Sequence, residues 1–101
     1  MKLAMVIYTG PEQANTATLI GIARSARAKG NDVTVFAMSA GVRNLAREDF
    51  VKLADDGVKI AVCDHNRTGF NAPADVDGVS YGSQYDLAGY VNGCDRFLSF
   101  T

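Results

Sequence analysis

The chain has 101 residues, a mass of 10.8 kDa and a formal net charge of −1, so it can form one domain with a core but not two. Apolar residues make up 48% of it, which is typical of a globular protein and argues against disorder. The near-neutral charge, with no block of like charge, gives no reason to expect binding to nucleic acid or to an anionic membrane.

The chain opens with an apolar run over residues 2–8, which predicts a central strand. This run is too short for a signal sequence or a membrane span, so we expect a cytoplasmic protein. A helix is expected from near Pro11 to a stop at Gly30. Its apolar stripe consists of Leu19, Ile22, Ala23 and Ala26.

A second strand is predicted over residues 32–38, and Gly57 later opens a third apolar run. Between them, residues 41–45 show no clear local preference. A second helix is expected from about Ala46 to Asp55. Its apolar side consists of Ala46, Phe50, Leu53 and Ala54.

The third strand, over residues 58–63, ends on Cys63, and a polar segment follows it at once. Residues 66–70 could form a helical turn there. In open α/β sheets, ligands and chemistry collect outside the carboxyl ends of the strands. Cys63 is therefore the first candidate for a functional residue.

The last third begins with an irregular segment, residues 68–78, of a length that is usually functional or mobile in so small a domain. A short fourth strand follows at 79–81. Ser83 and Asp86 have the spacing of a capping box at the start of a helix, and the final strand is expected at 96–100.

Strands and helices thus alternate along the whole chain, which is the pattern of βαβ units. We predict a single α/β domain over residues 1–101, built as a three-layer α/β/α sandwich on a five-stranded parallel sheet.

Two interpretations of Cys63 are possible. It is either a small buried residue at a strand end or a reactive thiolate. A thiolate needs a nearby cation or helix N-terminus, and Arg67 is the cation that is near in sequence. Cys94 has only Asp95 and Arg96 as polar neighbours, so a structural role is expected for it. In a reducing compartment both are expected to be thiols.

Cys63, Asp64 and His65 are each possible metal ligands, and His65 is also a possible base. No second Cys/His pair follows at zinc-finger spacing, so we expect no metal site. A His in a loop is more often simply solvated.

The loop after the first strand is a second candidate site, because backbone amides at a helix N-terminus bind phosphate. Its residues do not match either glycine-rich phosphate motif, and Glu12 would repel an anion, so a plain turn is the better interpretation. If a ligand does bind across the loops after the first and third strands, its contacts are Thr9, Gly10, Asn15, Thr16, Asp64, His65, Asn66 and Gly69.

Several segments together resemble the DsrE/DsrF-like sulfur-relay family. Each is weak alone, and their order and spacing over nearly the whole chain carry the resemblance. They are Val33–Phe36 with Gly41-Val42, Gly57–Cys63, Arg67-Thr68-Gly69, Gly82–Ala88 and Cys94–Phe100.

The resemblance implies an α/β/α fold and homotrimers, hexamers or rings of related subunits. It also implies that Cys63 occupies the position at which sulfur-transfer members carry a persulfide. Some relatives have a second Cys three residues later, where this chain has Asn66, so a C-x-x-C dithiol mechanism is not available.

The leading hypothesis is a sulfur carrier in which Cys63 accepts sulfur from a donor protein and passes it to an acceptor, with Arg67 stabilising the thiolate and no cofactor. The alternatives are a module that binds a small ligand such as a nucleotide or flavin phosphate, and an oligomeric scaffold without chemistry. We also expect a homo-oligomer, because the resemblance implies one, with a trimer as the favoured unit, and because aromatic residues, which are enriched at interfaces, cluster in the last third of the chain.

Overall fold

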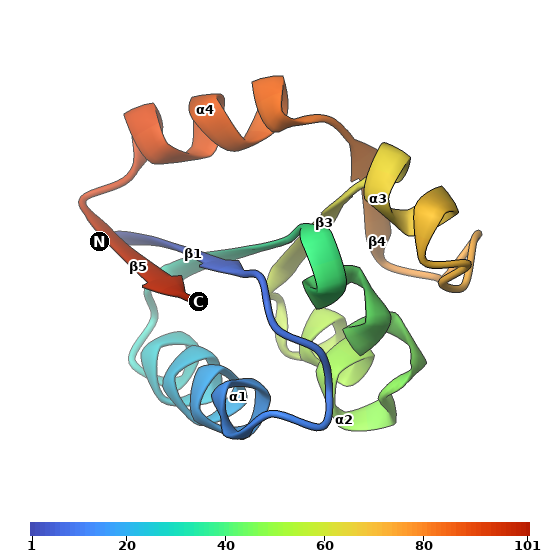
Figure 1. Cartoon of the computed structure of the whole chain (residues 1–101). Coiled ribbons are helices and arrows are strands. Elements are labelled where there is room, and N and C mark those ends of the chain that lie inside the picture. Colours follow the sequence, from blue (N-terminus) through green and yellow to red (C-terminus); the bar gives the residue numbers. More distant parts are fainter.

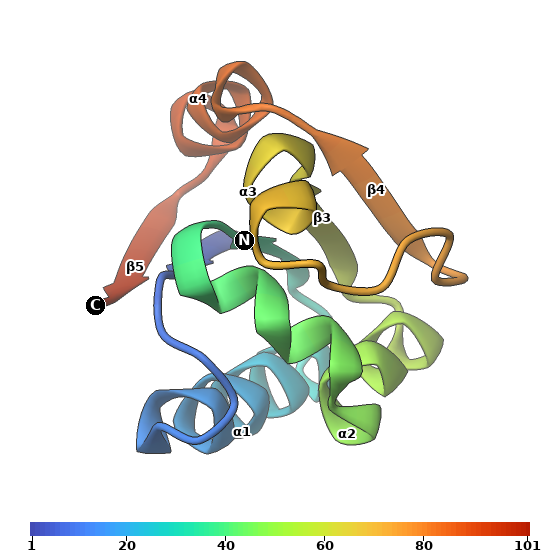
Figure 2. The same ribbon diagram turned by 45° about the vertical axis from the view of Figure 1, so that its right-hand side comes forward.

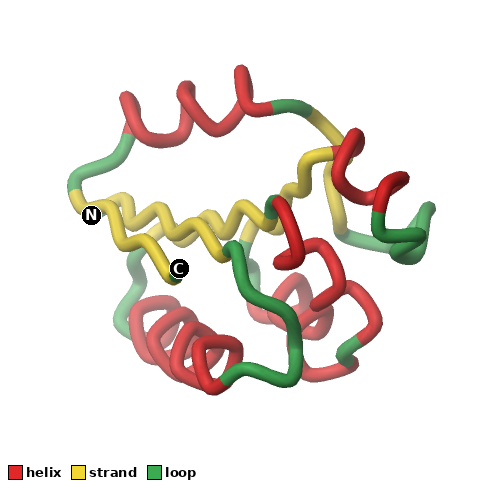
Figure 3. Tube along the Cα trace, in the orientation of Figure 1, coloured by secondary structure: helices red, strands yellow, loops and turns green.

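The computed structural model describes residues 1–101 as one sheet between two layers of helices (Figure 1, Figure 3). Every strand is within one residue of its predicted bounds at both ends. The strands are β1 (Lys2–Ile7), β2 (Asp32–Ala37), β3 (Lys59–Cys63), β4 (Val79–Gly82) and β5 (Arg96–Phe100).

The sheet has the order β4-β3-β2-β1-β5, and every neighbouring pair is parallel. The predicted α/β/α architecture on a five-stranded parallel sheet is therefore confirmed. Residues in register on parallel strands share a face, so the pairing of Ala4 with Thr34, and of Thr34 with Lys59, places all three side chains on one side of the sheet.

The helices are α1 (Ala14–Ala28), α2 (Glu48–Val51), α3 (Asp64–Gly69) and α4 (Gln84–Gly93), with 3-10 helices η1 (Ser39–Ala46) and η2 (Lys52–Asp56). The predicted capping box is present: the Ser83 side chain accepts the Tyr85 N–H, and the Asp86 carboxylate accepts the Ser83 N–H. None of these helices combines the length and the apolar character needed to cross a membrane.

The helix predicted from about Ala46 to Asp55 starts later, at Glu48, and is an α-helix only to Val51, after which it continues as the 3-10 helix η2. Of its predicted apolar side, Phe50 and Leu53 are buried and Ala54 is half-buried, but Ala46 is exposed and lies in η1, which the extended backbone of Arg47 separates from α2. The Arg47 side chain donates hydrogen bonds to Asp49 and to the distant carbonyl of Pro11. This contact across the fold accompanies a break that local helical spacing did not reveal.

Residues 41–45, which show no clear local preference in the sequence, are part of η1. Contacts with distant parts of the chain favour this conformation. Gly41 lies against the carbonyl group of Ile7 so closely that a Cβ atom would overlap it. Val42 and Leu45 add their side chains to the core beside it. The conformation here follows from contact with β1, which lies more than thirty residues earlier in the chain.

The two faces of the sheet are covered unequally. Helices α1 and α2 and both 3-10 helices lie on one side, α4 lies across the other, and α3 lies at the carboxyl end of β3 (Figure 1, Figure 2). The side with α1 holds a core cluster of 17 buried residues, whereas the side with α4 holds only Val6, Phe36, Ala61 and Cys63. No residue of α4 is buried.

The close contact at Gly41 gives a prediction about stability. Gly41→Ala should lower the free energy of unfolding by more than about 2 kcal/mol, because the new methyl group meets backbone atoms that have no room to move. Gly21→Ala, on the exposed side of α1 with nothing near its Cβ position, should raise it by about 0.5–1 kcal/mol. Urea unfolding of both variants measures this, and equal stabilities would contradict it.

Candidate functional site

Cys63 is the last residue of β3 and the N-cap residue of α3. Its side chain belongs to the small cluster on the α4 side, with Val6, Phe36 and Ala61, and the residue is 5% exposed. It is a free thiol, as is Cys94. The strand end that sequence reasoning selected is thus where it was expected, but the thiol is covered rather than open to solvent.

Helix α4 provides part of that cover, and Tyr8 after β1 and Met38 after β2 provide the rest. Leu87 and Tyr90 pack against the cluster that contains Cys63, and the Tyr90 ring centroid lies 6.4 Å from that of Phe36. On the neighbouring strand, Gly82 is in register with Cys63, so no side chain from β4 lies beside the thiol. A reagent therefore reaches the Cys63 thiol only if some of these covering side chains move.

Arg67 is held by groups other than Cys63. Its guanidinium donates to the Asp64 carboxylate at 3.1 Å, to the Ala72 carbonyl at 3.1 Å and to the Thr68 hydroxyl at 2.8 Å. These bonds connect the start of α3 to the loop that follows it. A role for Arg67 in stabilising a Cys63 thiolate stays a prediction, and it requires the guanidinium to leave some of these partners.

Asn66 has a structural role at the carboxyl end of the sheet. Its side-chain oxygen accepts the backbone N–H of Ser39 at 2.8 Å, and Ser39 has a left-handed backbone with φ of 54°. Asn66 thus stabilises the turn that follows β2. His65 and Gly69 are exposed on α3, and no three His, Cys, Asp or Glu side chains gather into a group that could hold a metal ion.

Hydrogen bonds connect the loop after β1 to the start of α1 and to Asn44 of η1. Thr16 is fully buried and donates to the Asn44 side-chain oxygen at 2.7 Å, while Asn15 donates to the Thr9 hydroxyl at 3.2 Å. The Asn44 amide donates to the carbonyls of Thr9 and Gly41, both at 2.9 Å. The side chains proposed to hold a phosphate are therefore already partnered within the protein.

Asn44 was missed by the sequence analysis, although a signal for it exists. It is a polar residue between Val42 and Leu45, both buried in the core. A buried amide needs hydrogen-bond partners, and here the partners come from the loop after β1. Sequence spacing alone does not bring those two segments together.

Glu12 and Arg43 cover Gly10, with the Arg43 Nη1 atom 2.8 Å from the Glu12 carboxylate. The pKa of Glu12 is lowered from its usual 4.5, first by a hydrogen bond from its own backbone amide and then by the Arg43 guanidinium. A carboxylate held in its charged form at this position opposes a phosphate at the same loop. The geometry thus disfavours the nucleotide or flavin-phosphate interpretation here.

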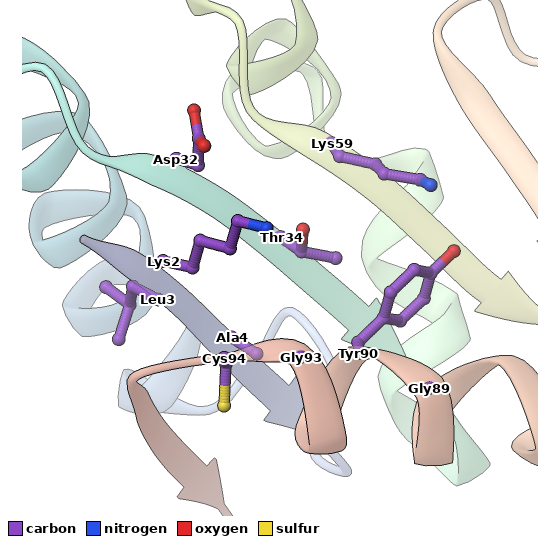
Figure 4. A pocket seen from close by; sticks show the side chains of 10 residues that line it. All are labelled: Lys2, Leu3, Ala4, Asp32, Thr34, Lys59, Gly89, Tyr90, Gly93 and Cys94. Carbon is purple, nitrogen blue, oxygen red and sulfur yellow. The ribbon is translucent and has the colours of Figure 1, made fainter.

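A cavity of about 320 Å³ lies at the opposite end of the sheet from Cys63, between α4 and the amino ends of β1, β2 and β3 (Figure 4). Lys2, Lys59 and Thr34 are among its lining residues and were not singled out from the sequence, whereas Tyr90, which also lines it, is one of the aromatic residues that cluster in the last third of the chain. Cys63 lines none of the surface cavities of the molecule.

Comparison with known proteins identifies related sequences and folds. The sequence model of the DsrE/DsrF-like family matches residues 1–100. The crystal structure of the YchN protein from E. coli is similar with a TM-score of 0.82 at 20% identity, covering 99% of each chain. A conserved protein of unknown function, BT1422 from Bacteroides thetaiotaomicron, is similar with a TM-score of 0.78 at 16% identity, covering 98% of this chain and 94% of that one. No curated protein sequence matches.

The contact between Glu12 and Arg43 gives a prediction about pH. Arg43→Met should raise the pKa of Glu12 part of the way to 4.5, because the backbone hydrogen bond, the larger cause, remains. Since the folded-state pKa of Glu12 is lowered, its contribution to stability is present above pH 4.5 and is lost as the pH falls through the folded-state value.

Carboxyl chemical shifts of Glu12, followed by NMR against pH, measure this effect. Asp49 is the internal control, because Arg47 lowers its pKa and is unchanged in the variant. An unaltered Glu12 midpoint in Arg43→Met would contradict the assignment.

Proposed function

The chain belongs to the DsrE/DsrF-like family, and from this premise we propose that it is a sulfur-relay protein whose Cys63 carries sulfane sulfur as a persulfide. The observation that supports the proposal is the placement of Cys63 as a free thiol at the carboxyl end of β3 and at the first turn of α3. This is the edge of a parallel sheet at which chemistry collects.

The reaction is a thiol exchange. The Cys63 thiolate attacks the outer sulfur of a donor persulfide, a new S–S bond forms, and the donor S–S bond breaks. The donor leaves as a thiolate and takes up a proton, and attack by an acceptor thiolate on the outer sulfur of Cys63 completes the transfer. No electrons are gained or lost overall, so the exchange needs neither a metal nor an organic cofactor.

Access to Cys63 is the step that the protein must control. The thiol is 5% exposed, and Leu87 and Tyr90 cover its cluster. Helix α4 buries no residue of its own, so the part of the cover that it supplies is loosely packed. A donor protein that displaces α4 would expose Cys63 only while the two proteins are bound, which would keep the persulfide from reacting with water-soluble thiols.

The partners in this proposal are a donor protein and an acceptor protein, and neither nucleic acid nor a membrane is involved. We place the protein in the cytoplasm, where its two free cysteines remain reduced. We further propose a homo-oligomer, with a trimer as the unit. Edge strand β5 supports this, because Phe97 is 41% exposed and Leu98 39% exposed, one on each face.

The persulfide proposal predicts a mass increase of about 32 Da, one sulfur atom, on the peptide that contains Cys63 after incubation with a persulfide donor. The increase should be absent in Cys63→Ser and kept in Cys94→Ser. Arg67→Ala should load more slowly at low pH if its guanidinium stabilises the thiolate.

Alkylation of the native protein separates access from reactivity. We expect Cys63 to be labelled by iodoacetamide under native conditions and labelled faster in Leu87→Ala, which opens the cover. If Cys63 is labelled only after denaturation and never gains sulfur, it is a core residue and the sulfur-relay proposal fails for this chain.

The oligomer proposal predicts a sedimentation mass that is a multiple of 10.8 kDa at micromolar concentration. Leu98→Lys should shift the protein toward the monomer, because an interface that buries more than about 1,000 Å² does not tolerate an unpaired charge. Phe70→Lys, a change at an exposed aromatic residue away from β5, is the matched control. A wild-type monomer would contradict the proposal.

A further inference from the structure

Two glycines of α4 form part of the roof of the cavity. Gly89 and Gly93 are four residues apart on α4, so they lie on the same side of the helix, and both line the cavity. A Cβ atom at either position would meet nothing within 4 Å. Glycine inside a helix costs about 0.5–1 kcal/mol relative to alanine, so α4 gives up stability at two positions where a larger residue would fill this space.

Two ammonium groups line the cavity without a carboxylate partner. The ion pairs of the structure include neither Lys2 nor Lys59. The Lys59 Nζ atom lies 4.8 Å from the centroid of the Tyr90 ring, and in Figure 4 the Lys2 side chain extends toward Thr34. The lining therefore presents two positive charges and one hydroxyl group close to the middle strand.

One acidic residue, Asp32, also lines the cavity. In Figure 4 its carboxylate points away from Tyr90, at the rim where β2 begins. The lining thus carries two positive charges and one negative charge, with the negative charge at the edge. This distribution favours an anion held between Lys59 and Lys2, on the side of the cavity away from the Asp32 carboxylate.

We propose that this cavity binds a small organic anion, namely an oxyanion such as a carboxylate joined to a flat apolar group. Lys2, Lys59 and the Thr34 hydroxyl take the oxyanion, and Tyr90 and Ala4 contact the apolar part. The volume of about 320 Å³ is at the small end of ligand pockets, which limits the ligand to roughly a single ring with its substituent. The site lies at the amino ends of the strands, so it neither uses nor requires Cys63.

Titration of the ¹⁵N-labelled full chain with benzoate, followed by amide NMR shifts, tests the proposal. We expect saturable shifts confined to the cavity, at Ala4, Thr34, Gly89 and Gly93. Benzamide, which has the same shape without the charge, should bind at least tenfold more weakly. Inorganic phosphate, which has charge without the apolar group, should also bind at least tenfold more weakly.

Two variants test the two parts of the site. Lys59→Met should weaken benzoate binding at least tenfold, whereas Lys52→Met, at a lysine paired with Glu48 on the other side of the molecule, should not change it. Gly89→Leu should abolish binding by filling the roof, and Gly21→Leu, at the equally open glycine of α1, should leave it intact. Amide spectra of the unliganded variants show whether each remains folded.

Any of three results would overturn the proposal. These are benzoate shifts that do not saturate or that centre on Phe97 and Leu98, equal affinity for benzamide or phosphate, and unchanged benzoate affinity in both Lys59→Met and Gly89→Leu. The persulfide proposal is unaffected by these outcomes, because Cys63→Ser should bind benzoate as the wild type does.

Discussion

A parallel sheet of five strands must be covered on both faces, and this chain covers them unequally. The side with α1 carries a core of 17 buried residues, whereas on the other side only four buried residues lie beneath α4. The first face accounts for most of the apolar burial that stabilises the fold. The second face is consequently where side chains and space are left for chemistry and for ligands.

Asn44 joins the loops at the carboxyl end of the sheet. Its side chain bonds to Thr16, to the carbonyl of Thr9 and to the carbonyl of Gly41, and all of this is buried. Removing a member of such a network leaves polar groups without partners in the interior, which costs about 1–3 kcal/mol for each group. The loop after β1 therefore has a structural role. The side chains of Asn15 and Thr16, which were candidates for binding a phosphate, are already hydrogen-bonded within the protein.

Helix α4 connects the two proposals about function. Near its start it covers Cys63 through Leu87, and near its end it forms the roof of the cavity through Gly89 and Gly93. Tyr90 takes part in both, since it packs on the cluster of Cys63 and also lines the cavity. A ligand that fixes the position of Tyr90 would therefore also fix one of the side chains that cover Cys63.

The sequence by itself determined the five strands, their parallel direction in an α/β/α fold, the capping box at Ser83 and the position of Cys63 at a strand end, because apolar runs and capping residues are local signals. Only the tertiary structure decided the break at Arg47, the closed loop at Asn44, the partners of Arg67 and the cavity beside Lys59. Each of these depends on groups brought together from distant parts of the chain, and the spacing of residues along a sequence does not encode that approach. Burial of the Cys63 thiol is decided in the same way, by side chains from α4 and from the ends of β1 and β2 that meet over it.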